Sequence, residues 1–267
     1  MSDPRTRGPR AKRSLGQNFL VDRRVVDRIM AGFAPTAGDI VVEIGPGQGA
    51  LTERLIGRVK KLYAIEFDSV LAPQLQVRFS DHSEFEVLED DALTFDLRRL
   101  VPEGHRLRLI ANLPYNISTA ILQRLFEFAD VLSDCVLMFQ REVAERITAV
   151  PARKDRGYLT VMTELYFDVD HMFDVPPSAF RPVPKVWSSV VRLVPKSTNI
   201  SDPDPFRKLV AAGFAQKRKT IANNLKALVP DVPARLERAG IDPGRRAETL
   251  TIDEWLRLNE VVAGQPY

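Results

Sequence analysis

The tetrapeptide Asn112-Leu113-Pro114-Tyr115 places a planar amide and an aromatic ring close together, directly after the apolar run 107–111. An amide can pair with the amino group of a flat nitrogen heterocycle, while an aromatic ring stacks on its face. Pro114 fixes its own φ and disfavours helix at Leu113, so the turn that carries both side chains is stiff. The motif predicts a site for such a heterocycle, with an ordinary strand-to-helix turn as the alternative.

A glycine loop and two carboxylates predict a nucleotide site that accompanies this turn. Gly45, Gly47 and Gly49 follow the apolar run 40–44, and glycine lets the backbone approach a ligand closely. Glu66 ends the next apolar run and could accept both hydroxyl groups of a ribose. Asp91 follows the third run, where it could meet the amino group of adenine. Each acid alone could be a solvated loop residue, but the combination favours a cofactor crevice.

The order of the acid and the glycines distinguishes two kinds of cofactor. Here Glu43 precedes the glycines, in the order E-x-G-x-G-x-G. Dehydrogenases that bind NAD more often show G-x-G-x-x-G. The order in this chain resembles that of methyltransferases that use S-adenosylmethionine, so NAD is the weaker alternative.

The elements that would position these residues follow an α/β pattern. An amphipathic helix is predicted at 21–34, and short apolar runs then alternate with helix-like segments, at 40–44, 61–65, 85–88, 107–111 and 135–140. This alternation predicts right-handed βαβ units and a mainly parallel sheet of the Rossmann-like type. The later β-rich runs 160–169 and 186–194 have no clear helix between them, so they predict an antiparallel pair at one edge.

The C-terminal part predicts a small all-α domain. The stretch 194–205 is rich in residues typical of linkers, and helices are predicted at 206–228, 232–239 and 252–262. We therefore expect a basic flexible tail at 1–13, a catalytic domain at 14–198 that binds S-adenosylmethionine, and a helical domain at 199–267. A C-terminal extension packed on the first domain is the alternative.

Composition and charge exclude some classes of protein and favour one kind of partner. No apolar run approaches the roughly 18 residues needed to cross a bilayer, and the Arg-rich start is no secretory signal, so we expect a cytoplasmic protein without a membrane partner. Cys135 is the one cysteine, and the three histidines are far apart, so we expect neither an internal disulfide nor a metal. Two clusters without acids, 5–13 and 206–226, predict a polyanionic partner, although a solvated tail and an exposed helix face would also explain them.

Several segments together resemble one enzyme family over nearly the whole chain. The order of segments is similar to that of the KsgA and Erm family of rRNA adenine N6-dimethyltransferases; the segments are 14–20, the glycine loop, 63–66, 112–118, 140–146 and 180–186. The later segments 175–180, 215–221 and 246–250 resemble the KsgA branch. Leu15 stands where the family often has Phe, a change of similar volume.

The resemblance implies S-adenosyl-L-methionine as methyl donor, with no metal. It implies a cofactor pocket lined by Asn18, Leu20, Gly45, Glu66, Asp91 and Asn112. Residues 17–20 would form a flap over the methionine end, with a simple approach to the first helix as the alternative. The resemblance also implies a monomeric enzyme that dimethylates two adjacent adenosines near the 3′ end of small-subunit rRNA, on an immature small ribosomal subunit and late in its assembly. An Erm-type enzyme acting on large-subunit rRNA, or a non-catalytic assembly factor, is the alternative.

We expect the site to localise the lone pair of the adenine amino nitrogen. The side-chain carbonyl of Asn112 and the backbone carbonyl of Leu113 or Pro114 would accept the two amino protons, and the proton would leave after methyl transfer. Tyr115 and Phe180 would stack on the two faces of the flipped base. The alternative for Phe180 is a ring buried in the core.

Overall fold

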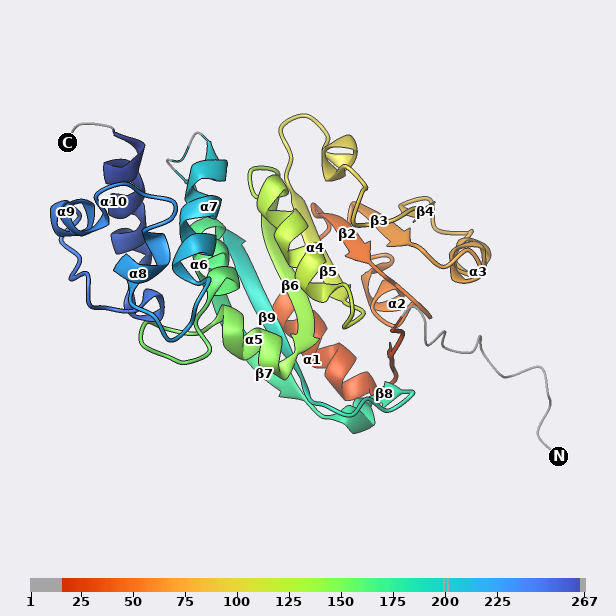
Figure 1. The fold of residues 1–267 in the computed structure, drawn as a ribbon. Helices are drawn as coiled ribbons and strands as arrows, with labels where there is room; N and C mark the ends of the chain where they lie inside the picture. Colours follow the sequence, from red (N-terminus) through yellow and green to blue (C-terminus); the bar gives the residue numbers. More distant parts are fainter. Residues whose placement is uncertain (1–15, 199, 201, 265–267) are drawn as a thin grey trace. The chain divides into compact units, whose positions relative to one another are not determined.

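The computed structural model describes residues 16–198, 200 and 202–264 (Figure 1). The basic tail predicted at 1–13 therefore lies outside the described residues. Among the described residues, no helix is long and apolar enough to cross a membrane. Contacts between Cα atoms divide the chain into two units, which are described separately below.

A seven-stranded sheet dominates the first unit, with the strand order β4-β3-β2-β5-β6-β9-β7. The neighbouring strands from β4 to β6 are parallel, and β9 is antiparallel to β6. The bounds are β2 Ile40–Ile44, β3 Lys61–Glu66, β4 Phe85–Glu89, β5 Leu107–Asn112, β6 Leu132–Gln140, β7 Phe167–Val175 and β9 Ser188–Pro195. The predicted Rossmann-like, mainly parallel sheet with an antiparallel edge is confirmed.

The strand order reverses between β2 and β5, and this reversal positions the site. From β2 the chain continues outward through β3 and β4, then returns to place β5 on the other side of β2. A ligand crevice forms at such a switch point, beyond the carboxyl ends of the strands. All five residues of β2 are buried, as expected for a parallel strand covered on both faces.

The helices of the first unit bury their apolar faces against the sheet. Helix α1 (Arg23–Phe33) begins after Asp22, whose side chain accepts the N–H of Arg24. One core cluster joins α1 to alternate residues of the central strands, such as Val41 and Ile110. The other elements are α2 Thr52–Leu55, α3 Leu71–Arg78, η3 Leu97–Leu100, α4 Ser118–Leu125, η4 Phe126–Phe128, α5 Arg141–Ile147, η5 Pro177–Ala179 and the paired short strands β1 Phe19–Leu20 and β8 Phe180–Arg181.

The run 160–169 is mainly helical, so the prediction of a strand there is wrong. Helix α6 spans Tyr158–Tyr166, and the edge strand β7 begins only at Phe167. Within α6 the hydroxyl of Thr163 donates to the carbonyl of Leu159, the back-bond that lets threonine stand in a helix. Nearly every residue of α6 is buried, so its sequence lacks the polar face that reveals a helix.

The second unit contains the C-terminal helices together with residues 145–169. Arg156, which is 2% exposed, joins the two segments because it binds Glu164 and the carbonyl of Leu250. The helices here are α6, α7 Pro203–Gly213, α8 Ile221–Leu225, α9 Val232–Arg238 and α10 Ile252–Ala263, with η6 Ala247–Thr249. This division differs from the predicted one by placing 145–169 with the helices, while the junction at residues 195 and 196 lies close to the predicted boundary.

One helix predicted in this unit is in fact two separate helices. The stretch 206–228 breaks after Gly213, and α8 begins after Thr220, whose hydroxyl accepts the N–H of Asn223. A Cβ at Gly213 would lie 2.4 Å from the Trp255 ring, so that glycine provides the space for close packing with α10. The helical character of the C-terminal part is confirmed.

Candidate functional site

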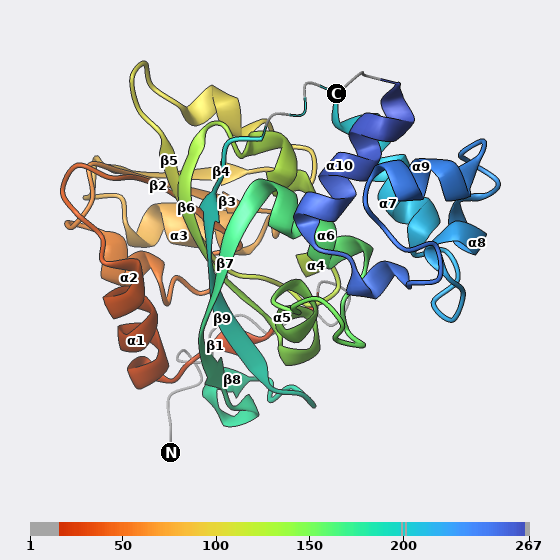
Figure 2. The same ribbon diagram turned by 90° about the vertical axis from the view of Figure 1, so that its left-hand side faces the viewer.

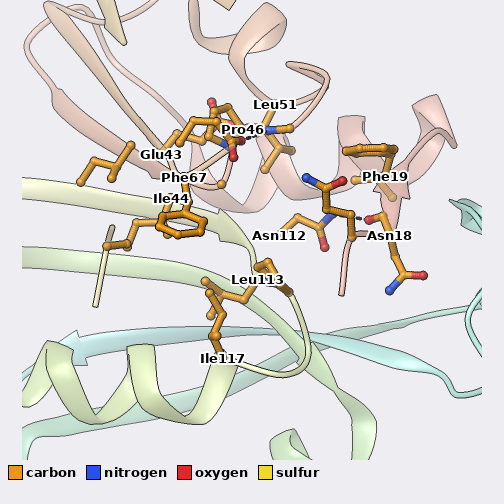
Figure 3. A pocket seen from close by; sticks show the side chains of 18 of the residues that line it. Asn18, Phe19, Glu43, Ile44, Pro46, Leu51, Phe67, Asn112, Leu113 and Ile117 are labelled. Atoms are coloured by element: carbon orange, nitrogen blue, oxygen red, sulfur yellow. Dashed lines mark hydrogen bonds between the residues drawn. The ribbon is translucent and has the colours of Figure 1, made fainter. Parts of the chain in front are cut away.

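A cavity opens beyond the carboxyl ends of β2, β3 and β5, at the switch point of the sheet (Figure 3). Nine of the residues singled out in the sequence line it: Asn18, Leu20, Gly45, Glu66, Asp91, Asn112, Leu113, Pro114 and Tyr115. The topology therefore brings together the glycine loop, both carboxylates and the Asn112–Tyr115 turn. All of them belong to the first unit.

Glu66 is held firmly at the end of β3. Its Oε2 accepts the N–H of Gly47 at 3.0 Å, and its Oε1 accepts the N–H of Asp68 at 2.9 Å. Burial raises the pKa of this carboxyl, and backbone hydrogen bonds from Asp68, Gly47 and Phe67 act in the opposite direction. A carboxylate has about four acceptor positions, so at least one remains for a ligand hydroxyl.

Asp91 lies in the loop that follows β4, and a backbone N–H also fixes its side chain. Its Oδ1 accepts the N–H of Leu93 at 2.9 Å, in a turn that holds the carboxylate at the cavity. Across the cavity, Gly45 and Gly47 adopt φ of 64° and 58°, conformations that glycine reaches without strain. The loop and the carboxylate thus face one space.

Asn112 has a defined amide orientation. Its Nδ2 donates to the backbone carbonyl of Asn18 at 3.1 Å (Figure 3). A carbonyl oxygen can only accept, so the atom that faces it must be the nitrogen. The side-chain oxygen of Asn112 is consequently the atom left to accept a hydrogen bond from a ligand.

Tyr115 is anchored at its far end. Its hydroxyl lies 2.7 Å from the hydroxyl of Ser188 at the start of β9. Burial raises the pKa of the phenol, so the ring is uncharged at neutral pH. The hydrogen bond restrains a ring that lines the cavity and leaves its face as an apolar surface.

The segment 16–20 lies against both loops. A Cβ at Gly16 would lie 2.5 Å from Oδ1 of Asn116, and a Cβ at Gly47 would lie 3.1 Å from the ring of Phe19. Gln17 donates to Asp68 at 3.1 Å, and β1 pairs with β8. This flap therefore connects the glycine loop, the end of β3 and the Asn112–Tyr115 turn.

Phe180 does not lie at the cavity, contrary to the predicted stacking clamp. Its side chain is 0% exposed and packs in the core cluster with α1 residues such as Ile29 and Phe33. Strand β8, whose Phe180 pairs with Leu20, holds it there. The two prolines that follow suggested an exposed loop, but the residue before them is still in a strand.

Glu43 sits beneath the glycine loop and is 1% exposed. It accepts the hydroxyl of Thr52 at 2.7 Å. Burial, with a smaller contribution from the nearby Glu66 charge, raises the pKa of Glu43 to about 7. A carboxyl that can change protonation near neutral pH thus lies in the lining of the cavity.

Comparison with known proteins identifies the family. The family described as ribosomal RNA adenine dimethylase matches residues 8–264. The chain belongs to this family. It is an rRNA methyltransferase, and the resemblance to the KsgA branch is confirmed by its relatives. The ribosomal RNA small subunit methyltransferase A of Saccharophagus degradans is 41% identical over 264 residues, 98% of this chain and 97% of the relative. The protein of the same name from Chromohalobacter salexigens is 44% identical over 95% of this chain and 92% of the relative.

Solved structures agree with this membership in the dimethylase family. A dimethyladenosine transferase from Plasmodium falciparum aligns with a TM-score of 0.78 and 28% identity, covering 90% of this chain and 95% of that one. The 23S rRNA methyltransferase ErmE aligns with a TM-score of 0.70 and 29% identity, covering 92% of this chain and 100% of that one.

Sequence reasoning missed one ring in this dimethylase cavity. Phe67 follows Glu66, lines the cavity and is 61% exposed, an unusual exposure for phenylalanine. It offers an exposed apolar surface at the cavity, one residue after the predicted ribose-binding Glu66. The sequence did carry a signal for Phe67. It is an aromatic residue directly after the acid that ends a predicted strand.

Proposed function

We propose that the protein transfers two methyl groups to N6 of each of two adjacent adenosines near the 3′ end of small-subunit rRNA, with S-adenosylmethionine as donor. The observation that carries the chemistry is the hydrogen bond from Asn112 Nδ2 to the Asn18 carbonyl, because it leaves the amide oxygen as an acceptor in the cavity. The names of the full-length relatives support the choice of RNA.

The lining of the cavity fits the proposed donor. Glu66 keeps an acceptor position for a ribose hydroxyl, Asp91 can accept from the adenine amino group, and Phe67 offers an apolar surface for the adenine ring. The glycine loop lets backbone come close to the ligand. When bound, S-adenosylmethionine supplies a methyl group on a positively charged sulfur.

Asn112 activates the adenine amino group by orientation. The amino nitrogen is a poor nucleophile because its lone pair is delocalised into the ring. Acceptance of one proton by the Asn112 side-chain oxygen, and of the other by a backbone carbonyl, holds the lone pair out of the ring plane. Pro114 already accepts the N–H of Ile117 at 3.1 Å, which favours the carbonyl of Leu113 as the second acceptor.

Tyr115 supplies the stacking surface for the target base. Stacking on an aromatic ring contributes about 1 to 3 kcal/mol, comparable to the few kcal/mol lost when a base leaves its stack. The anchored hydroxyl limits the motion of this ring. We propose Tyr115 alone for this role, since Phe180 is buried in the core.

The proposed setting is late assembly of the small ribosomal subunit in the cytoplasm, with the protein acting as a monomer. An Erm-type activity on large-subunit rRNA is the second candidate, because the fold aligns with ErmE at a TM-score of 0.70. A non-catalytic assembly factor is less favoured, since a binder has no need for an oriented amide beside a carboxylate-lined cavity.

Transfer of labelled methyl from S-adenosylmethionine to purified, unmethylated small subunits, with mapping of the modified nucleotides, tests the proposal. We expect two adjacent dimethylated adenosines near the 3′ end. Separated large subunits serve as the parallel substrate. Label in the large subunit alone would support the Erm-type activity, and label in neither, from a folded protein that binds small subunits, would support the assembly factor.

A further inference from the structure

An exposed tryptophan lies one residue from the anchor of Tyr115. Trp187 is 47% exposed, while the following residue, Ser188, is buried and bonds the Tyr115 hydroxyl. Among the described phenylalanine and tryptophan residues, Phe67 and Trp187 are the two with exposed side chains. Phe67 lines the cavity, so Trp187 is the one without an assigned role.

Backbone pairing holds Trp187 in place. Its carbonyl accepts the N–H of Arg141 at 2.9 Å, which extends the β6–β9 register one step beyond the pair Gln140 and Ser188. Arg141 is the first residue of α5, and its Nε lies 4.0 Å from Asp174 Oδ2, so its cation already has an anionic neighbour.

The surroundings of Trp187 suit a nucleotide. The segment 181–187 contains Arg181 and Lys185, both exposed, and no acid. Val183 and Val186 are also exposed, so the segment presents three large apolar side chains to solvent. Large apolar side chains exposed close together are a feature of interaction sites. The segment joins β8 to β9 (Figures 1 and 2).

We propose that Trp187 is a stacking platform for a nucleotide next to the target adenosine, with Lys185 contacting an adjoining phosphate. Ser188 pairs with Gln140, the last residue of β6, so Trp187 leaves the sheet at the edge where the carboxyl ends of the parallel strands meet and the cavity opens. A base in the cavity against Tyr115 would then have its neighbour available to the indole at the same edge. This inference rests on the proposed function for the identity of the RNA.

The test compares Trp187→Ala with Trp187→Phe in methyl transfer to unmethylated small subunits. Loss of a stacked base costs about 1 to 3 kcal/mol, so Trp187→Ala is expected to lower kcat/KM for the subunit roughly 5- to 150-fold. Trp187→Phe retains a ring and should stay near wild type. Val77→Ala, which truncates a 76% exposed apolar residue on α3, is the matched control and should not change kcat/KM.

Intrinsic fluorescence tests the contact independently of methylation. The chain has two tryptophans, and Trp255 is 0% exposed, so the difference between the wild-type and Trp187→Phe spectra isolates Trp187. We expect single-stranded RNA to quench this difference signal. Unchanged fluorescence with bound RNA, or wild-type kcat/KM in Trp187→Ala, would overturn the role of Trp187. A wild-type protein that binds RNA with quenching but methylates no small subunits would instead overturn the proposed function alone.

Discussion

At the scale of single residues, Asn112 carries the proposed chemistry. Its amide nitrogen is bonded to the carbonyl of Asn18, so the same side chain orients its oxygen and restrains the flap. Asn112→Ala should lower kcat for methyl transfer roughly 100- to 1000-fold, the range typical for removal of one preorganised polar group from an active site. Single-turnover assays on small subunits measure this effect. Titration of S-adenosylmethionine separates it from weaker donor binding, and a kcat within a few-fold of wild type would remove Asn112 from the mechanism.

The raised pKa of Glu43 predicts that the stability of the protein depends on pH in an unusual way. Its pKa is raised from an ordinary 4.5 to about 7, so the folded protein binds its proton more tightly than the unfolded chain does. The free energy of unfolding must therefore fall as pH rises from about 4.5 to about 7. Above that range the whole loss of stability caused by ionising the buried carboxyl is present. Glu43→Gln cannot ionise, so it should be more stable than wild type above about pH 7, by up to about 3 kcal/mol.

Denaturation of both proteins without added ligand, over this pH range, measures the difference. The gain from Glu43→Gln should grow between pH 4.5 and 7 and then remain constant. A difference that does not vary with pH would show that Glu43 ionises as it does in the unfolded chain.

The position of Phe180 could not be predicted from its local sequence. The sequence placed the ring at the site because a Pro-rich segment follows it, whereas strand pairing of Phe180 with Leu20 places it in the core. Glu66, Asp91 and Asn112 were predictable because each ends or follows a strand of a parallel sheet, and such ends meet at one edge. A burial that depends on pairing between β1 and β8 has no comparable local signal.

At the scale of elements, the flap is defined by glycine conformations. Gly16 has φ of 63°, and a Cβ there would lie 2.5 Å from Asn116 Oδ1. Gly16→Ala should displace the flap from the Asn112–Tyr115 turn and weaken binding of S-adenosylmethionine about tenfold or more, because the Asn18 carbonyl would leave Asn112. Calorimetric titration with the donor provides the measurement.

Gly57→Ala is a matched control for this variant. Gly57 also has positive φ, of 74°, but a Cβ there would meet nothing within 4 Å. The two variants share the cost of the backbone conformation, which is about 1 kcal/mol. Only Gly16→Ala adds the clash. Equal donor affinity in the two variants would show that the flap does not depend on this close approach.

The strands were more predictable than the helices in this chain. The five runs from 40–44 to 135–140 became β2 to β6, because short aliphatic runs separated by helical segments have few other arrangements. The helix α6 was missed because Tyr158–Tyr166 is buried on nearly all sides. The break between α7 and α8 was missed because the contacts that accompany it join residues apart in sequence: the Asn224 amide donates to the Gly213 carbonyl, and the Trp255 ring packs against Gly213.

At the scale of the whole molecule, we expect two basic clusters to supply attraction for RNA that is independent of its sequence. One is the tail 5–13, with five cations, and the other is 206–226, where Lys217, Arg218 and Lys219 are exposed between α7 and α8. Each cation that neutralises a phosphate releases a counterion, so affinity falls as salt rises. Binding of small subunits should therefore weaken steeply with salt concentration.

Removal of either cluster should lower the salt dependence of subunit binding. The size of the decrease measures how many phosphate contacts that cluster makes. The slope of log K against log salt changes by roughly 0.7 to 0.9 for each contact, so deletion of residues 1–13 should reduce it by up to about 4. The triple variant Lys217→Gln, Arg218→Gln, Lys219→Gln should reduce it by up to about 2.5 on the same basis. Both variants retain the residues that line the cavity, so affinity for S-adenosylmethionine should be unchanged. A triple variant with a wild-type salt slope would mean that the exposed cations between α7 and α8 do not touch the RNA, and that its phosphates are bound elsewhere.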